Sequence, residues 1–96
     1  MNRAQTIEIL VRSKPVLVDR YRVKRLALFG STARDAATQG SDIDILVSFD
    51  GPATSERYFG VQFYLEDQLG SDIDLVTEKS LRAELRPHIE QEAIDV

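Results

Sequence analysis

The sequence has no cysteine, so neither a disulfide bond nor a thiolate metal site can form within it. It also has no long apolar run. The longest, within Asp44–Phe49, is the size of a strand and far short of the roughly 20 residues that cross a membrane. The opening residues Met1–Gln5 are not followed by an apolar block and a small-residue cleavage site, as a secretory signal would be. These absences predict a soluble, cytoplasmic protein without membrane contact.

Basic residues are also in the minority. The chain has 12 Lys and Arg against 16 Asp and Glu, which gives a net charge of −4. Proteins that hold nucleic acid by its phosphates usually present a basic face, and the only basic cluster here lies within Arg20–Arg25. The charge balance therefore disfavours nucleic acid as a partner, although charges can segregate on a folded surface.

The composition is that of an ordinary globular protein, and the chain is short. Hydrophobic residues make up 43% and charged residues 29% of 96 residues, enough for one modest core. No linker, low-complexity stretch or composition shift divides the chain. We therefore expect a single domain over residues 1–96.

Helical and strand-like patterns alternate along the chain. The expected helices are Thr6–Val11, a second helix capped by Ser13 that runs to about Tyr21, Thr32–Ala37, Tyr58–Leu69 capped by Thr54 or Ser55, and a last helix opened by Ser80 and bent at Pro87. The expected strands are Val23–Phe29, Asp42–Phe49 and Asp72–Val76, and turn residues fill Thr38–Ser41. This order predicts an α/β (α+β) fold, with a small mixed sheet of about three strands flanked by helices.

One short segment occurs twice. Gly40–Asp44 and Gly70–Asp74 have the same sequence, Gly-Ser-Asp-Ile-Asp, but the residues that flank them do not match. Repeat architectures need several copies. We interpret the two segments as two strands that begin with similar turn chemistry.

The first copy contains a pair of aspartates at strand spacing. Residues two apart on a strand point to the same face, so Asp42 and Asp44 should project together while Ile43 and Ile45 enter the core. Neighbouring carboxylates repel each other unless a proton or a cation lies between them, and Mg²⁺ prefers carboxylate oxygens. The pair is therefore a candidate metal site. Taken alone, an Asp-x-Asp is more often a solvated strand end.

Two further features strengthen this interpretation. The apolar strand that ends at Phe29 is followed by Gly30 and Ser31, where a close backbone approach, free N–H groups and a hydroxyl would suit a phosphate. The strand that follows the second copy would carry Asp72 and Asp74 on one face. If it neighbours the strand of Asp44, three carboxylates beside a phosphate loop could hold two divalent ions around a triphosphate. Alternation by itself does not separate Asp72 from Asp74.

These residues resemble a known family signature. Phe29-Gly30-Ser31, the ten residues Thr32–Ser41, and then Asp42-Ile43-Asp44 look like the motif of the polymerase-β-type nucleotidyltransferase superfamily. The likeness is greater to its minimal, MNT-type members and extends to Glu92–Val96 at the end of the chain. The resemblance implies a polymerase-β-like nucleotidyltransferase fold.

The resemblance also implies roles for individual residues. Asp42 and Asp44 would be paired metal ligands, and Asp74, in its Ile-Asp-Leu-Val setting, would be the third catalytic carboxylate; Asp72 is a lesser candidate. Gly30 and Ser31 would cradle the β- and γ-phosphates. Arg34 stands where minimal members commonly carry an arginine that could touch the triphosphate, although a surface arginine is an equal alternative. One departure is Asp35, where minimal members usually have glycine.

The implied function is transfer of AMP from ATP to a hydroxyl, with two Mg²⁺ ions. MNT-type domains are often encoded beside a HEPN-domain RNase toxin, and the implied acceptor is a tyrosine of such a partner in a hetero-oligomer, which makes the chain an antitoxin. One alternative is a non-catalytic antitoxin that neutralises its partner by occlusion. Another is transfer to a small molecule or an RNA end, which the short length and the acidic balance disfavour.

Overall fold

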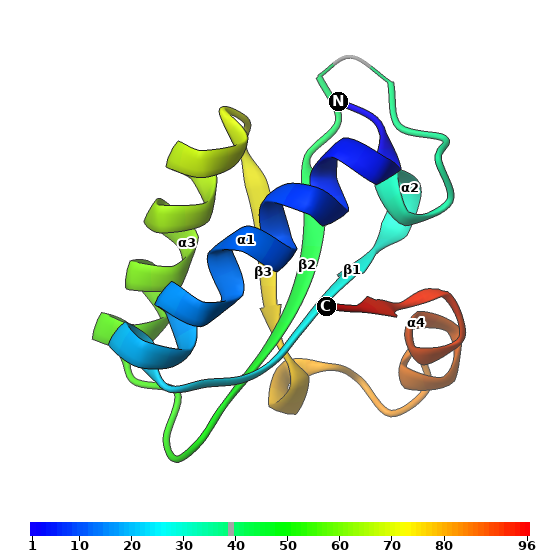
Figure 1. Cartoon of the computed structure of the whole chain (residues 1–96). Coiled ribbons are helices and arrows are strands. Elements are labelled where there is room, and N and C mark those ends of the chain that lie inside the picture. Colours follow the sequence, from blue (N-terminus) through cyan, green and yellow to red (C-terminus); the bar gives the residue numbers. More distant parts are fainter. Residues whose placement is uncertain (39) are drawn as a thin grey trace.

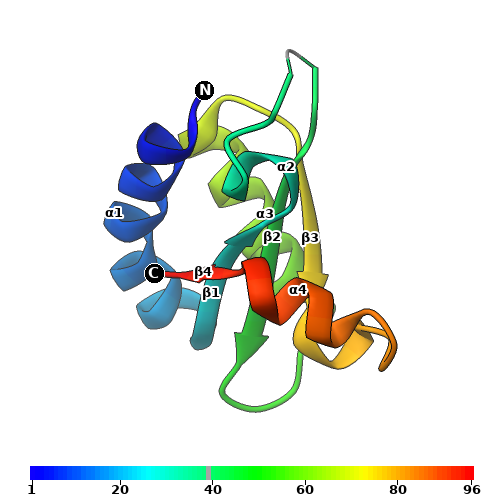
Figure 2. The same cartoon turned by 90° about the vertical axis from the view of Figure 1, so that its right-hand side faces the viewer.

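The computed structural model describes residues 1–38 and 40–96. It contains one four-stranded sheet in the order β3-β2-β1-β4, with α1 and α3 on one face and α4 on the other (Figures 1 and 2). The helices and strands, in chain order, are α1 (Arg3–Tyr21), β1 (Val23–Phe29), α2 (Gly30–Ala33), β2 (Ile43–Phe49), α3 (Ser55–Leu69), β3 (Ile73–Thr77), the 3₁₀ helix η1 (Glu78–Ser80), α4 (Arg86–Glu92) and β4 (Ile94–Asp95). None of the described helices is long and apolar enough to cross a membrane.

The mixed α/β class was predicted, but the strand count was wrong. The sheet has four strands because the last residues, Ile94 and Asp95, pair antiparallel with β1 opposite Leu28 and Ala27. A two-residue strand is too short to show an alternating pattern, so only its pairing in the fold reveals it.

The first two expected helices are a single helix. α1 opens with a capping box in which Asn2 accepts a hydrogen bond from Gln5 N–H at 2.9 Å, and it continues through Pro15. Proline costs a helix the hydrogen bond to the carbonyl four residues earlier, but here the helix buries a face against the sheet on both sides of that point. Ser13 is therefore not a cap; it lies inside α1 and is buried.

The other helix boundaries differ less. Thr54 is the N-cap of α3, which begins three residues before the expected Tyr58, and Gly70 ends it in the left-handed conformation. The expected helix at Thr32–Ala37 is the single turn α2 (Gly30–Ala33). The expected last helix does not start at Ser80, because that residue ends η1 and α4 begins at Arg86 with Pro87 in its first turn, where no N–H is needed.

β2 is one of the two inner strands of the sheet, and its two neighbours run in different directions. It runs antiparallel to β1 and parallel to β3, with Ile43 opposite Ile73 and Asp44 opposite Asp74. The two Gly-Ser-Asp-Ile-Asp copies therefore begin neighbouring strands in register. The turn Thr38–Ser41 before β2 was predicted, and Gln39 within it lies outside the described residues.

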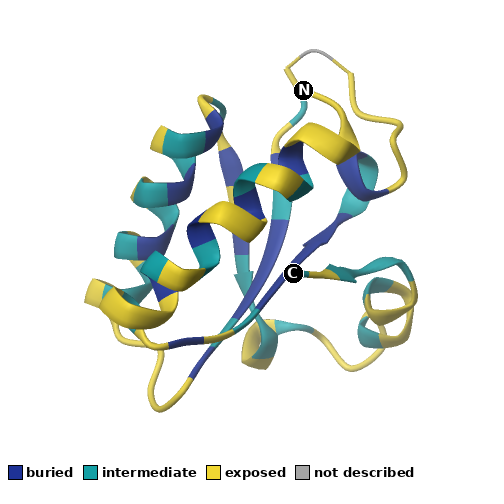
Figure 3. Cartoon of the chain, in the orientation of Figure 1, coloured by how far each residue is buried: buried dark blue, intermediate teal, exposed yellow. Residues whose placement is uncertain are grey.

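The core has two parts, one on each face of the sheet. On the α1 and α3 side the inward residues of β2 (Ile43, Ile45 and Val47) are buried, and in Figure 3 the sides of both helices that face the sheet are dark blue. On the α4 side Leu46 packs with Ala27 and Phe29. Asp44 shares the parity of Leu46, so the alternation of β2 directs it to the α4 side.

Candidate active site

Three elements meet at Asp44. It is the second residue of β2, it lies opposite Asp74 on β3 and opposite Phe29 at the end of β1, and its side chain is half-buried. Asp42 is exposed and comes just before β2, while Asp74 is exposed on β3. The structure therefore brings Asp44 and Asp74 side by side, with Asp42 two residues away along the chain.

The charge state of Asp44 reflects this crowding. Burial raises the pKa of Asp44 to about 6, with further contributions from the charges of Asp74 and Asp42, a hydrogen bond with Asp74, and the charge of Glu92. Each of these causes favours the neutral acid. A cation held between the carboxylates would remove the repulsion and restore the ionised form.

The donor set fits a hard divalent cation such as Mg²⁺, which takes carboxylate oxygens and keeps other positions for water and phosphate. Within residues 1–38 and 40–96, however, no three carboxylate or imidazole groups are already gathered into a metal cluster. Asp42, Asp44 and Asp74 are thus suitable in chemistry and neighbouring in position, and an ion would draw their side chains together.

Gly30 is required at its position for two independent reasons. Its φ is +74°, in the left-handed region that residues with a Cβ avoid. A Cβ there would also overlap the Asp44 carboxylate, with Cγ only 2.8 Å away. The backbone of the loop therefore lies directly against the aspartate, and Ser31 follows within the single turn of α2.

The Gly30 amide and Arg34 share one partner that the sequence did not reveal. Gly30 N–H donates to Glu92 Oε1 at 3.0 Å, and the Arg34 guanidinium donates to Glu92 Oε2 at 2.7 Å. Glu92 is the last residue of α4, 62 positions from Gly30 in the chain. Sequence spacing carries no signal for such a contact, because α4 folds back across the sheet to make it.

The register separates Asp74 from Asp72. Asp72 is exposed and comes before β3, where its carbonyl accepts a hydrogen bond from Ile43 N–H at 3.2 Å. Asp74 lies directly opposite Asp44 and perturbs its pKa, whereas Asp72 is not among the causes of that shift. Asp74 is therefore the stronger candidate for the third carboxylate.

Asp35 does not point its charge at the loop. Its Oδ1 accepts a hydrogen bond from Arg3 N–H at 3.2 Å, at the start of α1. Its φ is +57°, a conformation for which glycine is favoured and which Asp tolerates better than most residues. The backbone thus explains both the usual glycine of minimal family members and its replacement by aspartate here.

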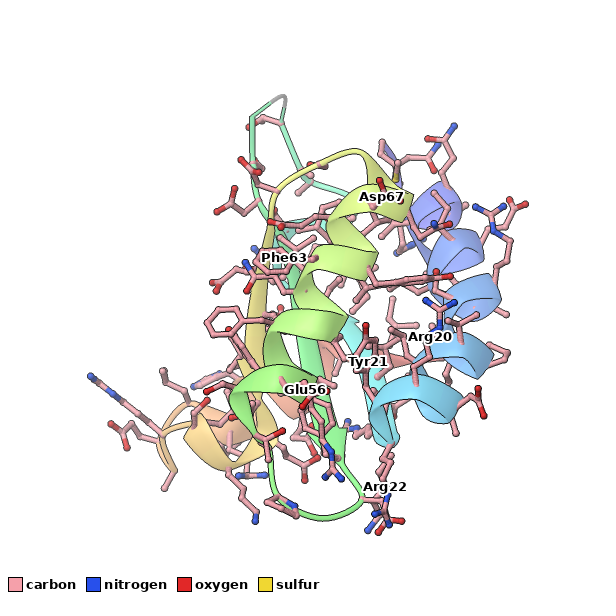
Figure 4. The ribbon with its side chains drawn as sticks, turned by 90° about the vertical axis from the view of Figure 1, so that its left-hand side faces the viewer. Arg20, Tyr21, Arg22, Glu56, Phe63 and Asp67 are labelled. Carbon is pink, nitrogen blue, oxygen red and sulfur yellow. The ribbon has the colours of Figure 1, made fainter. Side chains whose placement is uncertain are left out.

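The aromatic residues of α3 are divided between the core and the surface. Tyr58 and Tyr64 are partly buried against the core, and the Tyr58 hydroxyl donates to the Leu75 carbonyl of β3. Phe59 and Phe63 are exposed and stack with their ring centroids 6.0 Å apart. Figure 4 shows Phe63 on the outer surface of α3, between Glu56 and Asp67.

The chain is similar to known proteins over most of its length. The nucleotidyltransferase domain family matches residues 10–96. A protein of Methanocaldococcus jannaschii assigned as a protein adenylyltransferase is 51% identical over 77 residues, which is 77% of this chain and 76% of that protein. A solved structure described as a minimal nucleotidyltransferase has a TM-score of 0.84 at 32% identity and covers 100% of this chain and 97% of its own.

The fold also matches a chain from a solved complex of a tri-AMPylated HEPN toxin with an MNT antitoxin from Shewanella oneidensis. The TM-score is 0.59 at 23% identity, and the match covers 98% of this chain and 67% of that chain. At this identity the likeness concerns the fold. The family match and the 51% identity with the M. jannaschii protein together show that this chain is an enzyme of the nucleotidyltransferase domain family and is one of its minimal, MNT-type members.

Proposed function

We propose that this chain is a protein adenylyltransferase that moves AMP from ATP to a tyrosine hydroxyl of a HEPN-domain RNase toxin, and that it acts as the antitoxin of that toxin. The observation that carries the proposal is the register of β2 and β3, which sets Asp44 opposite Asp74 beside the backbone of Gly30. We further propose that residues 1–96 form a single catalytic domain that works in the cytoplasm, where ATP is available.

In this proposal each site residue has a distinct task. Asp42, Asp44 and Asp74 would hold two Mg²⁺ ions, and Gly30 and Ser31 would contact the β- and γ-phosphates. The ions would supply positive charge at the attacking oxygen and at the pyrophosphate. The acceptor oxygen would form a bond to the α-phosphorus, the bond from that phosphorus to pyrophosphate would break, and the hydroxyl proton would pass to the Asp74 carboxylate.

The position of Asp74 suits a large acceptor. β3 is an edge strand of the sheet formed by the described residues, and the Asp74 side chain is exposed on it. A hydroxyl on a protein surface could therefore reach Asp74 from solvent. Among the described residues, no further strand pairs with β3 on its outer side, and this open edge favours a protein acceptor over a small molecule.

The choice of partner and nucleotide rests on the comparisons. The M. jannaschii relative is named for adenylyl transfer to protein, and the complex that shares the fold contains an AMPylated HEPN toxin. We therefore propose ATP as the donor and a HEPN toxin, encoded nearby, as the partner in a hetero-oligomer.

The test is the intact mass of the neighbouring gene product after co-expression with this chain. Wild type should add AMP-sized increments, and Asp44→Asn should add none, because the variant removes a charge from the proposed metal site. A matched control is Asp50→Asn, which has the same change in charge at an exposed aspartate just after β2, paired with Arg22 at 3.2 Å; this variant should transfer as wild type does. Full transfer by Asp44→Asn would refute the mechanism.

The alternative of an occluding antitoxin makes a different prediction. In that case the partner would stay unmodified, yet a stable complex would form with wild type and with Asp44→Asn alike, and both would protect cells. Co-purification from the same expression experiment distinguishes the two outcomes.

A further inference from the structure

A carboxylate already occupies the loop that the proposed function assigns to phosphate. Glu92 places Oε1 at 3.0 Å from the Gly30 amide nitrogen and Oε2 at 2.7 Å from an Arg34 guanidinium nitrogen. Its side chain is 27% exposed, whereas that of Arg34 is 56% exposed. Two donors from the loop thus converge on one partly buried anion.

The same two donors, the Gly30 amide and the Arg34 guanidinium, could bind two oxygens of a phosphate group. Backbone amides and arginine are the usual partners of phosphate, and charge-assisted bonds of this length are the stronger kind. We propose that Glu92 is an internal anion that holds the Gly30–Arg34 loop in the nucleotide-free protein and competes with the triphosphate for it. This inference rests on the proposed function, because it takes ATP as the ligand that displaces Glu92.

Electrostatics makes the competition effective. Glu92 lies near enough to Asp44 to contribute to its raised pKa, so it adds a fourth negative charge to Asp42, Asp44 and Asp74. A triphosphate that approached the loop would meet both an occupied set of donors and an additional repulsive charge. Binding must therefore break the two hydrogen bonds of Glu92 and move its carboxylate away.

The surroundings confine this movement to the side chain. On either side of Glu92 the backbone is held through Arg25, which pairs with Glu90 at 2.9 Å and with Asp95 at 2.7 Å. β4 is paired with β1, and Val96 N–H donates to the Leu26 carbonyl at 3.0 Å. Glu92 can rotate toward solvent while these contacts remain, so nucleotide binding should leave β4 in place.

Glu92→Gln is the decisive variant, and Glu90→Gln is its matched control. Both residues lie on α4, both pair with an arginine, and both changes add one positive unit to the net charge. Glutamine at 92 still accepts from Gly30 but loses the charge that attracts Arg34 and repels phosphate. The probe is α,β-methylene ATP with Mg²⁺, in which the bond that transfer breaks is replaced, titrated calorimetrically into the purified chain.

We expect Glu92→Gln to bind the probe about three- to tenfold more tightly than wild type, while Glu90→Gln stays within about twofold. Glu92→Asp should also bind more tightly, because the shorter side chain cannot span both donors. In an Arg34→Gln background the gain from Glu92→Gln should shrink, since the two residues are coupled. If Glu92→Gln unfolds at the same temperature as wild type but binds the probe equally or more weakly, the inference is overturned.

A second measurement follows the loop itself. The Gly30 amide resonance should shift in Glu92→Gln without nucleotide and should shift in wild type when the probe is added, whereas the Ile94 amide should change little. A Gly30 resonance unaffected by saturating probe would contradict displacement.

The two proposals fail in different ways. If wild type binds the probe and modifies its partner but Glu92→Gln gains no affinity, only the role of Glu92 is refuted. If binding tightens as expected but no partner is modified, the proposed function is refuted and the role of Glu92 in nucleotide binding stands. If neither wild type nor Glu92→Gln binds the probe, both are refuted.

Discussion

Gly30 is the residue at which backbone conformation, packing and the proposed chemistry coincide. Its positive φ alone would be costly for any other residue, at about 1–2 kcal/mol. The overlap of a Cβ with the Asp44 carboxylate adds a second cost, because it displaces a side chain of the candidate site and not one of the core. The two costs can be separated experimentally because the chain contains a glycine that has only the first.

We expect Gly30→Ala to reduce AMP transfer by at least about 100-fold, because the Asp44 side chain must rotate away from the position opposite Asp74. Gly70→Ala is the control: its φ is +63°, and none of the described atoms outside its neighbourhood lies within 4 Å of the added Cβ. It should lose only the stability that the positive φ accounts for, less than Gly30→Ala loses, and keep its activity. Equal transfer rates for the two variants, measured on the same partner, would contradict the role of Gly30.

At the scale of elements, α1 shows how tertiary packing overrides local signals. Pro15 and the candidate cap Ser13 favoured two helices, yet one helix forms because a continuous face, including Leu10 and Leu17, is buried against the sheet. This packing leaves a defect, since the Ser13 hydroxyl is buried without a hydrogen-bond partner among the described residues.

Ser13→Ala should therefore raise the free energy of unfolding by about 1 kcal/mol, because it removes an unsatisfied polar atom and increases helix propensity. Thr6→Val on the same buried face should do the opposite, since the Thr6 hydroxyl donates to the Asn2 carbonyl at 2.9 Å. Urea unfolding of the two variants checks both signs. A loss of stability in Ser13→Ala would mean that the hydroxyl has a partner, such as a buried water.

A second contact between elements depends on Gly60. A Cβ on this residue of α3 would lie 2.6 Å from Cζ of Tyr21 on α1, so the absence of a side chain lets the two helices approach. α1 and α3 both cover the same face of the sheet (Figure 1). The glycine is thus retained in a helix interior, where it otherwise costs about 1 kcal/mol relative to alanine.

Gly60→Ala should lower the free energy of unfolding by about 1–3 kcal/mol through this overlap. In a Tyr21→Ala background the same change should be neutral or stabilising, because only the gain in helix propensity remains. The double-mutant cycle, measured by chemical unfolding, isolates the contact. Equal effects in both backgrounds would rule it out.

At the scale of the whole molecule, the fold gathers like charges that no single element contains. β2, β3 and α4 bring Asp44, Asp74 and Glu92 together, and the pKa of Asp44 rises from 3.8 to about 6, first because Asp44 is partly buried and then because of the neighbouring negative charges. A raised pKa means that the folded state binds the proton more tightly than the unfolded state does. The stability that the protonated form contributes is therefore complete below about pH 3.8, declines as the pH rises to about 6, and is absent above that value.

Without divalent cations, Asp44→Asn should therefore unfold at a higher temperature than wild type at pH 7.5, and the difference should narrow toward pH 4. Addition of Mg²⁺ should raise the midpoint of wild type more than that of the variant, since the cation binds the ionised carboxylates. Thermal unfolding at both pH values, with and without Mg²⁺, gives the four comparisons. A variant less stable than wild type at pH 7.5 in chelator would contradict the repulsion.

The sequence by itself determined the local features of this protein. The strand at Val23–Phe29 was predicted with its observed bounds, and the pairing of Asp42 and Asp44 on one face of the next strand was predicted too, because alternation depends on residues close in the chain. It also determined the mixed α/β class and, through a motif of nearby residues, the family. The predicted extent of α1 and the predicted start of α4 were wrong. Burial against distant elements decides where a helix continues, and local sequence does not reveal it.

Only the tertiary structure decided the rest. The family motif already favoured Asp74 over Asp72, but the position of Asp74 opposite Asp44 depends on the register of two parallel strands, which lie thirty residues apart in the chain. β4 and the contacts of Glu92 with Gly30 and Arg34 required the chain to fold back across the sheet. Such pairings depend on how elements pack in three dimensions, and the local sequence pattern does not indicate which distant residues will be in contact.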